Sequence, residues 1–469
     1  MNRKEVDKTK QDSKNSAWAE SLPQNARRAF EEAVQMHSVG KFSEAINHYA
    51  MALSFVPDDP VILTNLGVAL RGQDKFKASE MCYRRAIAIK QDSPGSWSNL
   101  GNVLRRMGRL KEAVNCHRKA VELDKKFIDA YYNMGLVLQD LGKLDEAIKI
   151  FDFCLKHKPG NVNINWDRSL ALLSKGDFLR GFEAYEYRWQ REELTERHFR
   201  EPLWDGTPLD GKRIFLYSEQ GFGDTLNFCR YVKEVAEAGG KVILECQKEL
   251  VSLLQGLVGL EEIVSAGDRL PEFEAQAPLL SLPHIMKHEI DSIPRECPYL
   301  NPPAQAGFPV HVPQGTKKKI GIVWAGKPTH KNDHNRSVNI ENFLIFTSLP
   351  GVTLYSLQKG PEAAQREQSA CGILVRELGG GCDDFADTAK VMQQLDLIIT
   401  VDTSVAHLAG GLGVPVWVAI PYNPDWRWMR KRNDSPWYPS MTLFRQKKPG
   451  NWDTVFSAMF KVLKSDMRL

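Results

Sequence analysis

The chain has 469 residues, of which 42% are hydrophobic and 26% charged, a composition typical of globular proteins with more than one domain. Its 62 basic and 58 acidic residues leave a formal charge of +4. So small an excess argues against nucleic-acid binding by the surface as a whole. No stretch approaches the roughly 18 apolar residues of a membrane-spanning helix, so we do not expect an integral membrane protein. The eight cysteines include no C-x-x-C pair, which favours a reduced, cytoplasmic setting.

The chain begins with a polar segment of mixed charge, and we predict a flexible tail over residues 1–25. A repeat follows. Gly40, Gly108, Gly142 and Gly176 lie on one 34-residue lattice (108 − 40 = 68, twice 34), and Asp74 occupies the remaining position. A bulky apolar residue comes two positions after each lattice point, and a small residue five positions after it. This period predicts stacked helix–turn–helix units.

The stretch "SWSNLGNVLRRMGRLKEAVNCHRKAVEL" (96–123) resembles the tetratricopeptide repeat. The resemblance covers residues 26–195 as four repeats and an atypical fifth, in which Arg168 and Ser169 replace the usual apolar–Gly pair. We expect this fifth unit to be a cap or a joint to the next domain. Such repeats usually bind protein segments and do no chemistry themselves.

Three asparagines, Asn65, Asn99 and Asn133, recur at the 34-residue spacing on the predicted inner helices. Their amides both donate and accept hydrogen bonds, so they are candidates to clamp the backbone of an extended acceptor peptide. The alternative is that asparagine simply suits a solvated helix face.

Strands and helices alternate in the rest of the chain, which predicts parallel sheets covered by helices. We predict one Rossmann-like domain over residues 205–300, a proline-rich linker over 301–316 and a second Rossmann-like domain over 317–469. The expected fold class is therefore α + α/β, a helical solenoid followed by two doubly wound domains with a ligand cleft between the carboxyl ends of their sheets. Neither the G-x-G-x-x-G fingerprint nor a P-loop is present, which disfavours dinucleotide oxidoreductases and P-loop NTPases.

The stretch "IITVDTSVAHLAGGLGVPVW" (398–417) predicts a buried strand followed by the start of a helix. Free N–H groups at a helix start favour an anion such as a phosphate, and the hydroxyls of Thr403 and Ser404 add donors. Asp402 and His407 are candidates to face the same donor ligand. The alternative is that Asp402, Thr403 and Ser404 only cap the helix.

A second donor-binding candidate is the basic loop after the strand at 318–326, with Lys327, Lys331 and Arg336. Cations there would stabilise the charge of a departing diphosphate; the alternative is a solvated basic loop. His330 and His334 have no evident third ligand, so we predict no metal site.

These pieces together resemble a glycosyltransferase of the GT-B fold, in particular the heptosyltransferase-like family 9, over residues 205–465. The matching motifs are Gly223–Asp224 and the run from Asp402 to Gly413. The resemblance implies that Asp224 is the general base that takes a proton from the acceptor hydroxyl. Glu219 is a rival base or an orienting partner. The alternatives are that Asp224 only caps a helix and that Glu219 is a solvated loop residue.

The loop at 423–440 is unusually rich in Trp and Arg. Asp425, Trp426 and Arg427 follow a predicted strand at its carboxyl end, so they are either nucleotide or sugar contacts or parts of an aromatic-stapled loop. The loop at 330–337 looks unlike the shorter lysine-containing loop of heptosyltransferases, which leaves the phosphate roles of Lys331 and Arg336 open.

The leading hypothesis is a metal-independent, inverting glycosyltransferase that needs no cofactor and uses a nucleotide-sugar as its substrate. Its acceptor would be a protein hydroxyl or amide selected by the solenoid. This architecture is similar to that of O-linked N-acetylglucosamine transferases, although their donor-site sequence is not apparent. Two alternatives stay open: a non-enzymatic repeat scaffold with a binding-only or inactive GT-B half, and transfer to a lipopolysaccharide or lipid-linked sugar.

Overall fold

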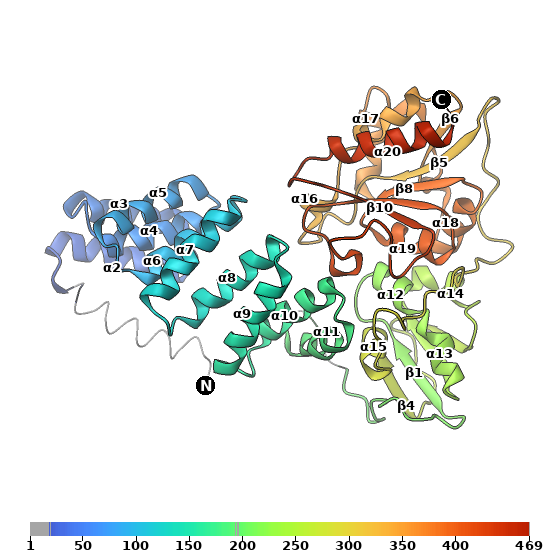
Figure 1. Cartoon of the computed structure of the whole chain (residues 1–469), viewed down its shortest axis with the longest axis horizontal. Helices are drawn as coiled ribbons and strands as arrows, with labels where there is room; N and C mark the ends of the chain where they lie inside the picture. The colour runs from blue at the N-terminus through green and yellow to red at the C-terminus, as the bar shows by residue number, and fades with distance from the viewer. Residues whose placement is uncertain (1–17, 19, 193, 195–196, 469) are drawn as a thin grey trace. The chain divides into compact units, whose positions relative to one another are not determined.

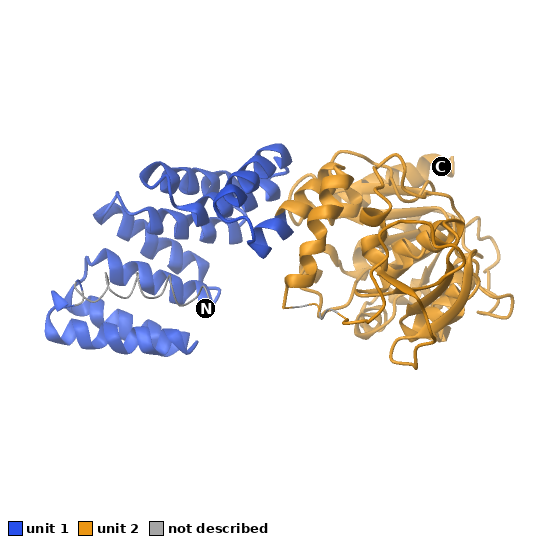
Figure 2. Cartoon of the chain, turned by 90° about the horizontal axis from the view of Figure 1, so that it is seen from below, with its two compact units in different colours: residues 1–167 blue, residues 168–469 orange. Residues whose placement is uncertain are grey.

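The computed structural model describes residues 18, 20–192, 194 and 197–468, and these fall into two compact units, residues 1–167 and 168–469 (Figure 2). Most of the tail predicted for residues 1–25 lies outside the described residues. Trp18 is described and packs edge-on against Phe30 with 5.0 Å between ring centroids. The first helix of the repeat region, α2, begins at Gln24.

Unit 1 is a series of helix hairpins (Figure 1). Its helices are α2 (Gln24–Ser38), α3 (Phe42–Phe55), α4 (Pro60–Gly72), α5 (Phe76–Ile89), α6 (Pro94–Arg106), α7 (Leu110–Leu123), α8 (Ile128–Asp140) and α9 (Leu144–His157). A fifth pair, α10 (Val162–Lys175) and α11 (Phe178–Tyr185), follows in the chain. The unit boundary falls inside α10, so α11 belongs to unit 2.

The glycine lattice marks the turn inside each hairpin. Gly40, Gly108, Gly142 and Gly176 all have positive φ, between 74° and 94°, the left-handed conformation that glycine adopts without steric cost. Asp74 holds the same conformation with φ of 56°, although it has a side chain. The lattice therefore reflects a backbone requirement rather than a ligand site.

The hairpins pack closely because small residues lie opposite rings. A Cβ atom on Gly67 would lie 2.8 Å from the ring of Tyr83, and one on Gly101 would lie 2.6 Å from His117. The alanines that come five positions after a lattice point, among them Ala45 and Ala113, are fully buried. These repeat residues form the core of unit 1, as interdigitated packing requires.

Unit 2 contains two parallel sheets. The sheet of the first lobe (residues 205–300) has the strand order β3-β2-β1-β4. Its strands are β1 (Arg213–Tyr217), β2 (Lys241–Cys246), β3 (Leu260–Ser265) and β4 (Ala275–Pro278). Its helices are α12 (Phe222–Phe228), α13 (Tyr231–Glu237), α14 (Val251–Leu254) and α15 (Leu282–Ile285).

The sheet of the second lobe (residues 317–469) has the strand order β10-β9-β8-β5-β6-β7, and every pair is parallel. Its strands are β5 (Lys318–Val323), β6 (Val352–Ser356), β7 (Val375–Glu377), β8 (Leu397–Val401), β9 (Val416–Ile420) and β10 (Met441–Arg445). Its helices are α16 (Asp333–Arg336), α17 (Gln365–Gln368), α18 (Phe385–Met392), α19 (Ser404–Gly411) and α20 (Asp453–Asp466).

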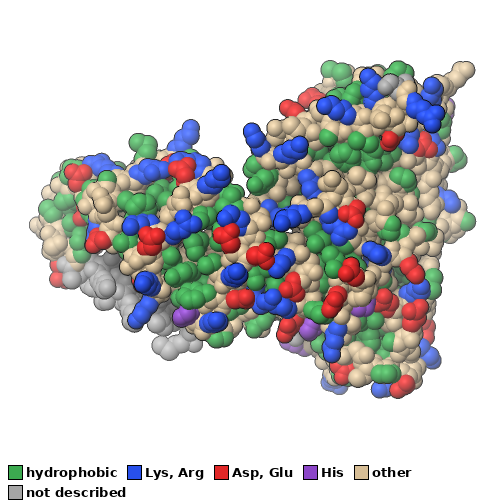
Figure 3. Space-filling model, in the orientation of Figure 1, with side chains coloured by type: hydrophobic (Ala, Val, Ile, Leu, Met, Phe, Trp, Pro, Cys, Tyr) green, Lys and Arg blue, Asp and Glu red, His purple; other side chains and the backbone are tan. Residues whose placement is uncertain are grey.

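The sheets differ from the sequence prediction in detail. Strands β4, β7 and β10 were not predicted, and residues 340–342 and 344–348 form two 3-10 turns between β5 and β6. The predicted linker at 301–316 contains no helix or strand. None of the helices in the described part of the chain is long and apolar enough to cross a membrane. On the face drawn in Figure 3, acidic and basic side chains are interspersed, in keeping with the small net charge.

Candidate functional site

Two helix starts meet where the lobes of unit 2 join. Helix α12 follows the carboxyl end of β1, and α19 follows the carboxyl end of β8 (Figure 1). A Cβ atom on Gly223 would lie 3.0 Å from Cδ2 of His407 and 3.6 Å from Cα of Ser404. Glycine therefore lets the backbone of α12 approach α19 closely. The Gly-Asp turn and the start of α19, both predicted from the sequence, are neighbours in space.

Asp224 lies at this junction and is held from both sides. Its Oδ2 accepts a hydrogen bond from the backbone N–H of Gly221 at 3.0 Å, and its Oδ1 accepts one from Nη2 of Arg427 at 2.5 Å. The side chain is 21% exposed, compared with 7% for Arg427. Asp224 thus caps its own helix and also pairs with a cation from the other lobe, so the two alternatives for this residue are not exclusive.

A buried carboxylate of the second lobe, Asp402, lies near Arg427. Asp402, at the end of β8, is buried, and burial together with the nearby charge of Asp425 raises its pKa to about 6. The charges of Arg336 and Arg427 oppose this rise. The buried indole N–H of Trp428 also lowers the pKa of Asp402, although it makes no hydrogen bond of normal geometry. The charges of one acid, Asp425, and two cations, Arg336 and Arg427, thus act on Asp402.

Of the three cations predicted to bind the donor from the loop after β5, Arg336 lies near Asp402. Its side chain is 15% exposed, its Nε lies 3.5 Å from Asp333, and its charge acts on Asp402. Lys327 and Lys331 are exposed. The described residues include no group of three or more His, Cys, Asp or Glu that could hold a metal ion.

The start of α19 is less fully capped than the sequence suggested. Thr403 occupies the N-cap position, but its side chain makes no capping hydrogen bond and instead approaches the hydroxyl of Thr400 at 3.3 Å. Helix N–H groups that no side chain caps remain available to an anion. Ser404 is half-buried at the first position of the helix.

His407 is placed differently from the prediction. The ring is buried, its Nδ1 lies 2.9 Å from the hydroxyl of Tyr438, and it stacks on Trp428 with 5.0 Å between centroids. Tyr438 in turn donates to Asn227 of the first lobe at 2.9 Å. Burial lowers the pKa of His407 well below its usual value, so the ring is neutral. His407 therefore belongs to the packing between the lobes rather than to an open ligand surface.

Glu219 is neither solvated nor free. Both of its oxygens accept hydrogen bonds from Arg188, at 2.9 and 3.0 Å, and one also accepts from the backbone N–H of Leu280. The Arg188 side chain is fully buried and also binds Glu186 and Ser281. Burial raises the pKa of Glu219, and the charge of Arg188 opposes that rise. Such a buried ion pair orients the turn and is poorly suited to act as a base.

The sequence analysis did not anticipate the aromatic support of this junction. Phe178 of α11 stacks on Trp437 at 5.6 Å, and Phe182 of α11 meets Trp426 edge-on at 5.6 Å. Trp426 in turn lies under the guanidinium of Arg427 at 4.2 Å. Helix α11 thus builds part of the wall behind the site, and its closely spaced aromatic residues are the sequence signal that could have predicted this contact.

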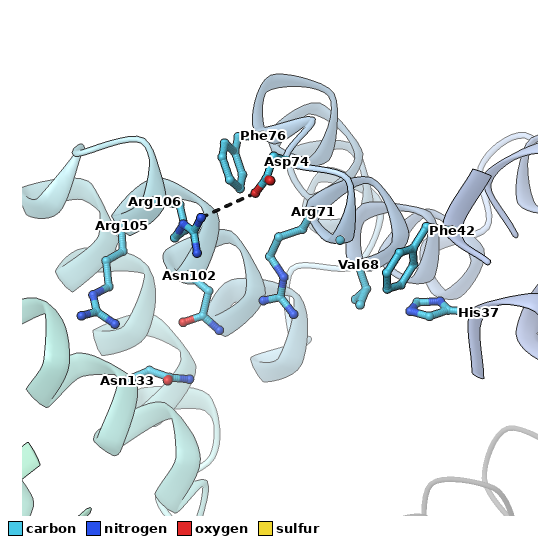
Figure 4. Close-up of a pocket in the computed structure, with 11 residues that line it drawn as sticks. His37, Phe42, Val68, Arg71, Asp74, Phe76, Asn102, Arg105, Arg106 and Asn133 are labelled. Atoms are coloured by element: carbon cyan, nitrogen blue, oxygen red, sulfur yellow. Dashed lines mark ion pairs between the residues drawn. The ribbon is translucent and has the colours of Figure 1, made fainter. Parts of the chain in front are cut away.

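Unit 1 contains a separate hollow of about 400 Å3 on its inner helices (Figure 4). It is lined by His37, Phe42, Val68, Arg71, Gly72, Asp74, Phe76, Asn102, Arg105, Arg106 and Asn133. Asn133 is thus the one member of the predicted clamp that lines it. Asn65 and Asn99 do not line the hollow, and the side-chain amide of Asn65 donates to the backbone oxygen of Val61 at 2.9 Å.

The three arginines of this hollow differ in their partners. Arg105 pairs with Asp140 at 2.5 Å, and Arg106 lies 3.5 Å from Asp74. Arg71 pairs with no carboxylate of the described residues. Figure 4 shows Arg71, Asn102 and Asn133 around the same space. The hollow therefore offers one uncompensated cation flanked by two amides.

Comparison with known proteins identifies the helical half. A "TPR repeat" profile matches residues 101–142, and "Tetratricopeptide repeat" profiles match residues 61–92 and 128–161. The N-terminal region contains tetratricopeptide repeats. Among solved structures, MamA is 22% identical with a TM-score of 0.32, covering 34% of this chain and 94% of its own. YrrB, described as a tetratricopeptide-repeat protein with an unusual peptide-binding site, is 20% identical with a TM-score of 0.31, covering 35% and 85%.

A relative that extends into the sheets is Protein FlbA of Caulobacter vibrioides, 24% identical over 331 residues. The match covers 63% of this chain and 54% of FlbA, so the chain spans about half of the length of this relative. The comparisons thus show tetratricopeptide repeats in the N-terminal region, and the glycosyltransferase resemblance stays a prediction.

Proposed function

We propose that unit 2 is a metal-independent glycosyltransferase that moves a sugar from a nucleotide-sugar to an acceptor hydroxyl. The observation that carries the proposal is the meeting of Asp224, from the first lobe, with Arg427, from the second, beside the start of α19. In open parallel sheets, ligands bind outside the carboxyl ends of the strands, and both sheets direct those ends to this junction.

In the proposed reaction, Asp224 takes the proton of the acceptor hydroxyl as its oxygen attacks the anomeric carbon. The new bond joins the acceptor oxygen to that carbon, and the bond from the carbon to the diphosphate oxygen breaks. The nucleoside diphosphate leaves with the electron pair. Arg336, with the N–H groups at the start of α19, would stabilise this charge. Attack opposite the leaving group inverts the anomeric centre.

The solenoid would select the acceptor, which we propose to be a protein segment. The hollow around Arg71 has the size of a small-ligand site, and its uncompensated guanidinium favours an acidic group on that segment. Asn102 and Asn133 can bind the backbone of an extended chain, since an amide both donates and accepts. This assigns Asn133 the clamping role predicted from the sequence.

One observation favours the non-enzymatic alternative, a repeat scaffold with a binding-only half. Each carboxylate oxygen of Asp224 already accepts a hydrogen bond, and Oδ1 is also paired with the charge of Arg427, as expected of a carboxylate with a structural role. In the enzymatic proposal, substrate binding releases Oδ1 from Arg427 so that the acceptor hydroxyl can take the place of the guanidinium.

The test is turnover of a panel of UDP-, GDP-, ADP- and CMP-sugars by the full chain, with product release as the readout. Asp224→Asn should lower turnover by about 10²–10⁴-fold, the usual contribution of a general base. Asp268→Asn, an exposed acid of the same lobe, serves as the matched control and should retain turnover. Equal turnover by Asp224→Asn would remove Asp224 from the mechanism, and binding of no nucleotide-sugar would favour the scaffold.

A further inference from the structure

Arg427 is fixed in place by contacts on several sides. Its backbone N–H and its Nη1 both donate to Oδ1 of Asp425, at 3.0 and 2.9 Å. The guanidinium lies 4.2 Å above the ring of Trp426 and 5.7 Å from that of Phe228. Stacking on an aromatic face and pairing with a carboxylate both restrict a guanidinium. Arg427 therefore has a defined position whether or not Asp224 contacts it.

The same guanidinium has a hydrogen-bond donor to spare. The Nε atom of Arg427 is buried and has no hydrogen-bond partner among the described residues. A buried donor without an acceptor is costly, and such groups often mark the site of a ligand. Asp224 and Asp425 together use only the two terminal nitrogens, Nη2 and Nη1.

Asp224 is the more displaceable member of the pair. Its side chain is 21% exposed and that of Arg427 is 7% exposed. It is carried by the first turn of the seven-residue helix α12, directly after Gly221 and Gly223. The other carboxylate on Arg427, Asp425, is 38% exposed, but it lies in the same turn and also accepts a hydrogen bond from the backbone N–H of Arg427, so Asp224, which comes from the other lobe, is the partner more readily replaced by an anion.

We propose that Arg427 binds the diphosphate of the donor, and that this exchange frees Oδ1 of Asp224 to accept the proton of the acceptor. The inference rests on the glycosyltransferase function proposed above and names the residue that couples donor binding to exposure of the base. In the unliganded chain the pair is closed, so the base is not available. With a diphosphate bound, Arg427 keeps Asp425 and exchanges one carboxylate for a phosphoryl group, two oxygens of which can accept from Nη2 and from the spare Nε.

The exchange has a distinctive signature. Because the ligand competes with Asp224 for one cation, removal of the carboxylate should strengthen diphosphate binding, although Asp224→Asn weakens turnover. If the Asp224–Arg427 pair must open before the diphosphate binds, the apparent affinity for the diphosphate is reduced in proportion to the fraction of molecules in which the pair is open. A residue with a purely structural role would weaken both binding and turnover, or neither.

The experiment is titration calorimetry of the full chain with inorganic pyrophosphate, without added metal. Asp224→Asn should bind pyrophosphate on the order of 10-fold more tightly than the unmodified chain, since it lacks the competing charge. Arg427→Gln should lose 10-fold or more in affinity, since it lacks the cation. Arg432→Gln is the matched control, because Arg432 lies in the same loop but pairs with Asp434 at the surface, and it should bind like the unmodified chain.

The outcomes separate the two proposals. Unchanged binding by Arg427→Gln, no gain by Asp224→Asn, or no binding by any of the four proteins would overturn the role of Arg427. If Arg427→Gln does not fold, the comparison of Asp224→Asn with the unmodified chain decides. The expected pyrophosphate pattern without binding of any nucleotide-sugar would sink the glycosyltransferase function and leave the Arg427 anion site standing. If Arg427→Gln turns over a nucleotide-sugar with an unchanged KM, the glycosyltransferase function stands and the role of Arg427 in donor binding is excluded.

Discussion

The buried pair between Arg188 and Glu219 makes a strong prediction, because it decides whether Glu219 is a base or a structural residue. Replacing Glu219 with Gln keeps the shape of the side chain and removes its charge. The Glu219 side chain is 3% exposed and that of Arg188 is 0% exposed, so the variant leaves a buried cation with one partner fewer. Breaking a buried pair in this way usually costs about 3–5 kcal/mol.

The structure places the expected loss at the lower end of that range. Arg188 keeps a second carboxylate, Glu186, at 2.6 Å, so it is not left without a counter-charge. We expect a loss of about 3 kcal/mol, which lowers the urea midpoint by about 1 M if the denaturant slope is near 3 kcal/mol/M. Tryptophan fluorescence is a suitable probe, since eight of the eleven tryptophans lie in unit 2 (11 − 3 in unit 1).

The control is Glu296→Gln, which removes the exposed pair with Lys233, where the Glu296 side chain is 86% exposed. An exposed pair of this kind contributes little to stability, so the midpoint of this variant should stay close to that of the unmodified chain. The reasoning is refuted if Glu219→Gln unfolds at the same midpoint as Glu296→Gln. A stable Glu219→Gln protein with abolished turnover would instead make Glu219 the base.

Three further predictions address the solenoid, its hollow and the acid at the end of β8. Asp74→Gly should stabilise the repeats by about 0.5–1 kcal/mol, because glycine adopts the left-handed turn without steric cost, and Gly108→Asp should destabilise them by a similar amount. Both changes are followed as a shift of the melting temperature in far-UV circular dichroism. No gain in the first variant would mean that Asp74 is not strained. Arg71→Ala should weaken binding of an acidic peptide, measured by fluorescence anisotropy, by about 10-fold, whereas Arg85→Ala, on an exposed site, should not. Equal affinities would exclude the hollow as the acidic-peptide site. The pKa of Asp402 is raised from 3.8 to about 6, so its burial destabilises the folded chain above pH 6, and this penalty fades as the pH falls towards 4. In urea titrations, Asp402→Asn should therefore gain about 2 kcal/mol relative to the unmodified chain between pH 4 and pH 7.5. A difference that stays constant with pH would contradict the burial argument.

Much of the helical half could be predicted because its pattern is local. A left-handed turn every 34 residues requires glycine, and the lattice from Gly40 to Gly176 records that requirement directly. The strands with long apolar runs, such as β8, were also predictable. Two of the three missed strands are short: β4 has four residues and ends in proline, and β7 has three residues at the edge of the sheet. The third, β10, has five residues but lies at the opposite edge. In such segments tertiary pairing, not local preference, decides the conformation.

The site was predictable only in part, because its partners are distant in sequence. The position of Asp224 near Thr403 follows from the rule that ligands meet the carboxyl ends of parallel strands. The pairing of Asp224 with Arg427 joins residues 203 positions apart, and no local pattern records it. The burial of Glu219 likewise depends on Arg188, which lies at the end of the fifth repeat. Charged residues in loops look solvated until their partners are known.

The aromatic contacts of α11 bear on how such chains can change over evolution. Because Phe178 and Phe182 pack into the indole cluster beside Arg427, helix α11 is tied to the sheets of its own unit, whereas the hairpins from α2 to α9 contact mainly their neighbours in the row. Whole 34-residue modules can then be gained or lost upstream without disturbing the junction. Related chains should accordingly vary in the length of the row but keep a bulky aromatic face on the hairpin that precedes the first strand.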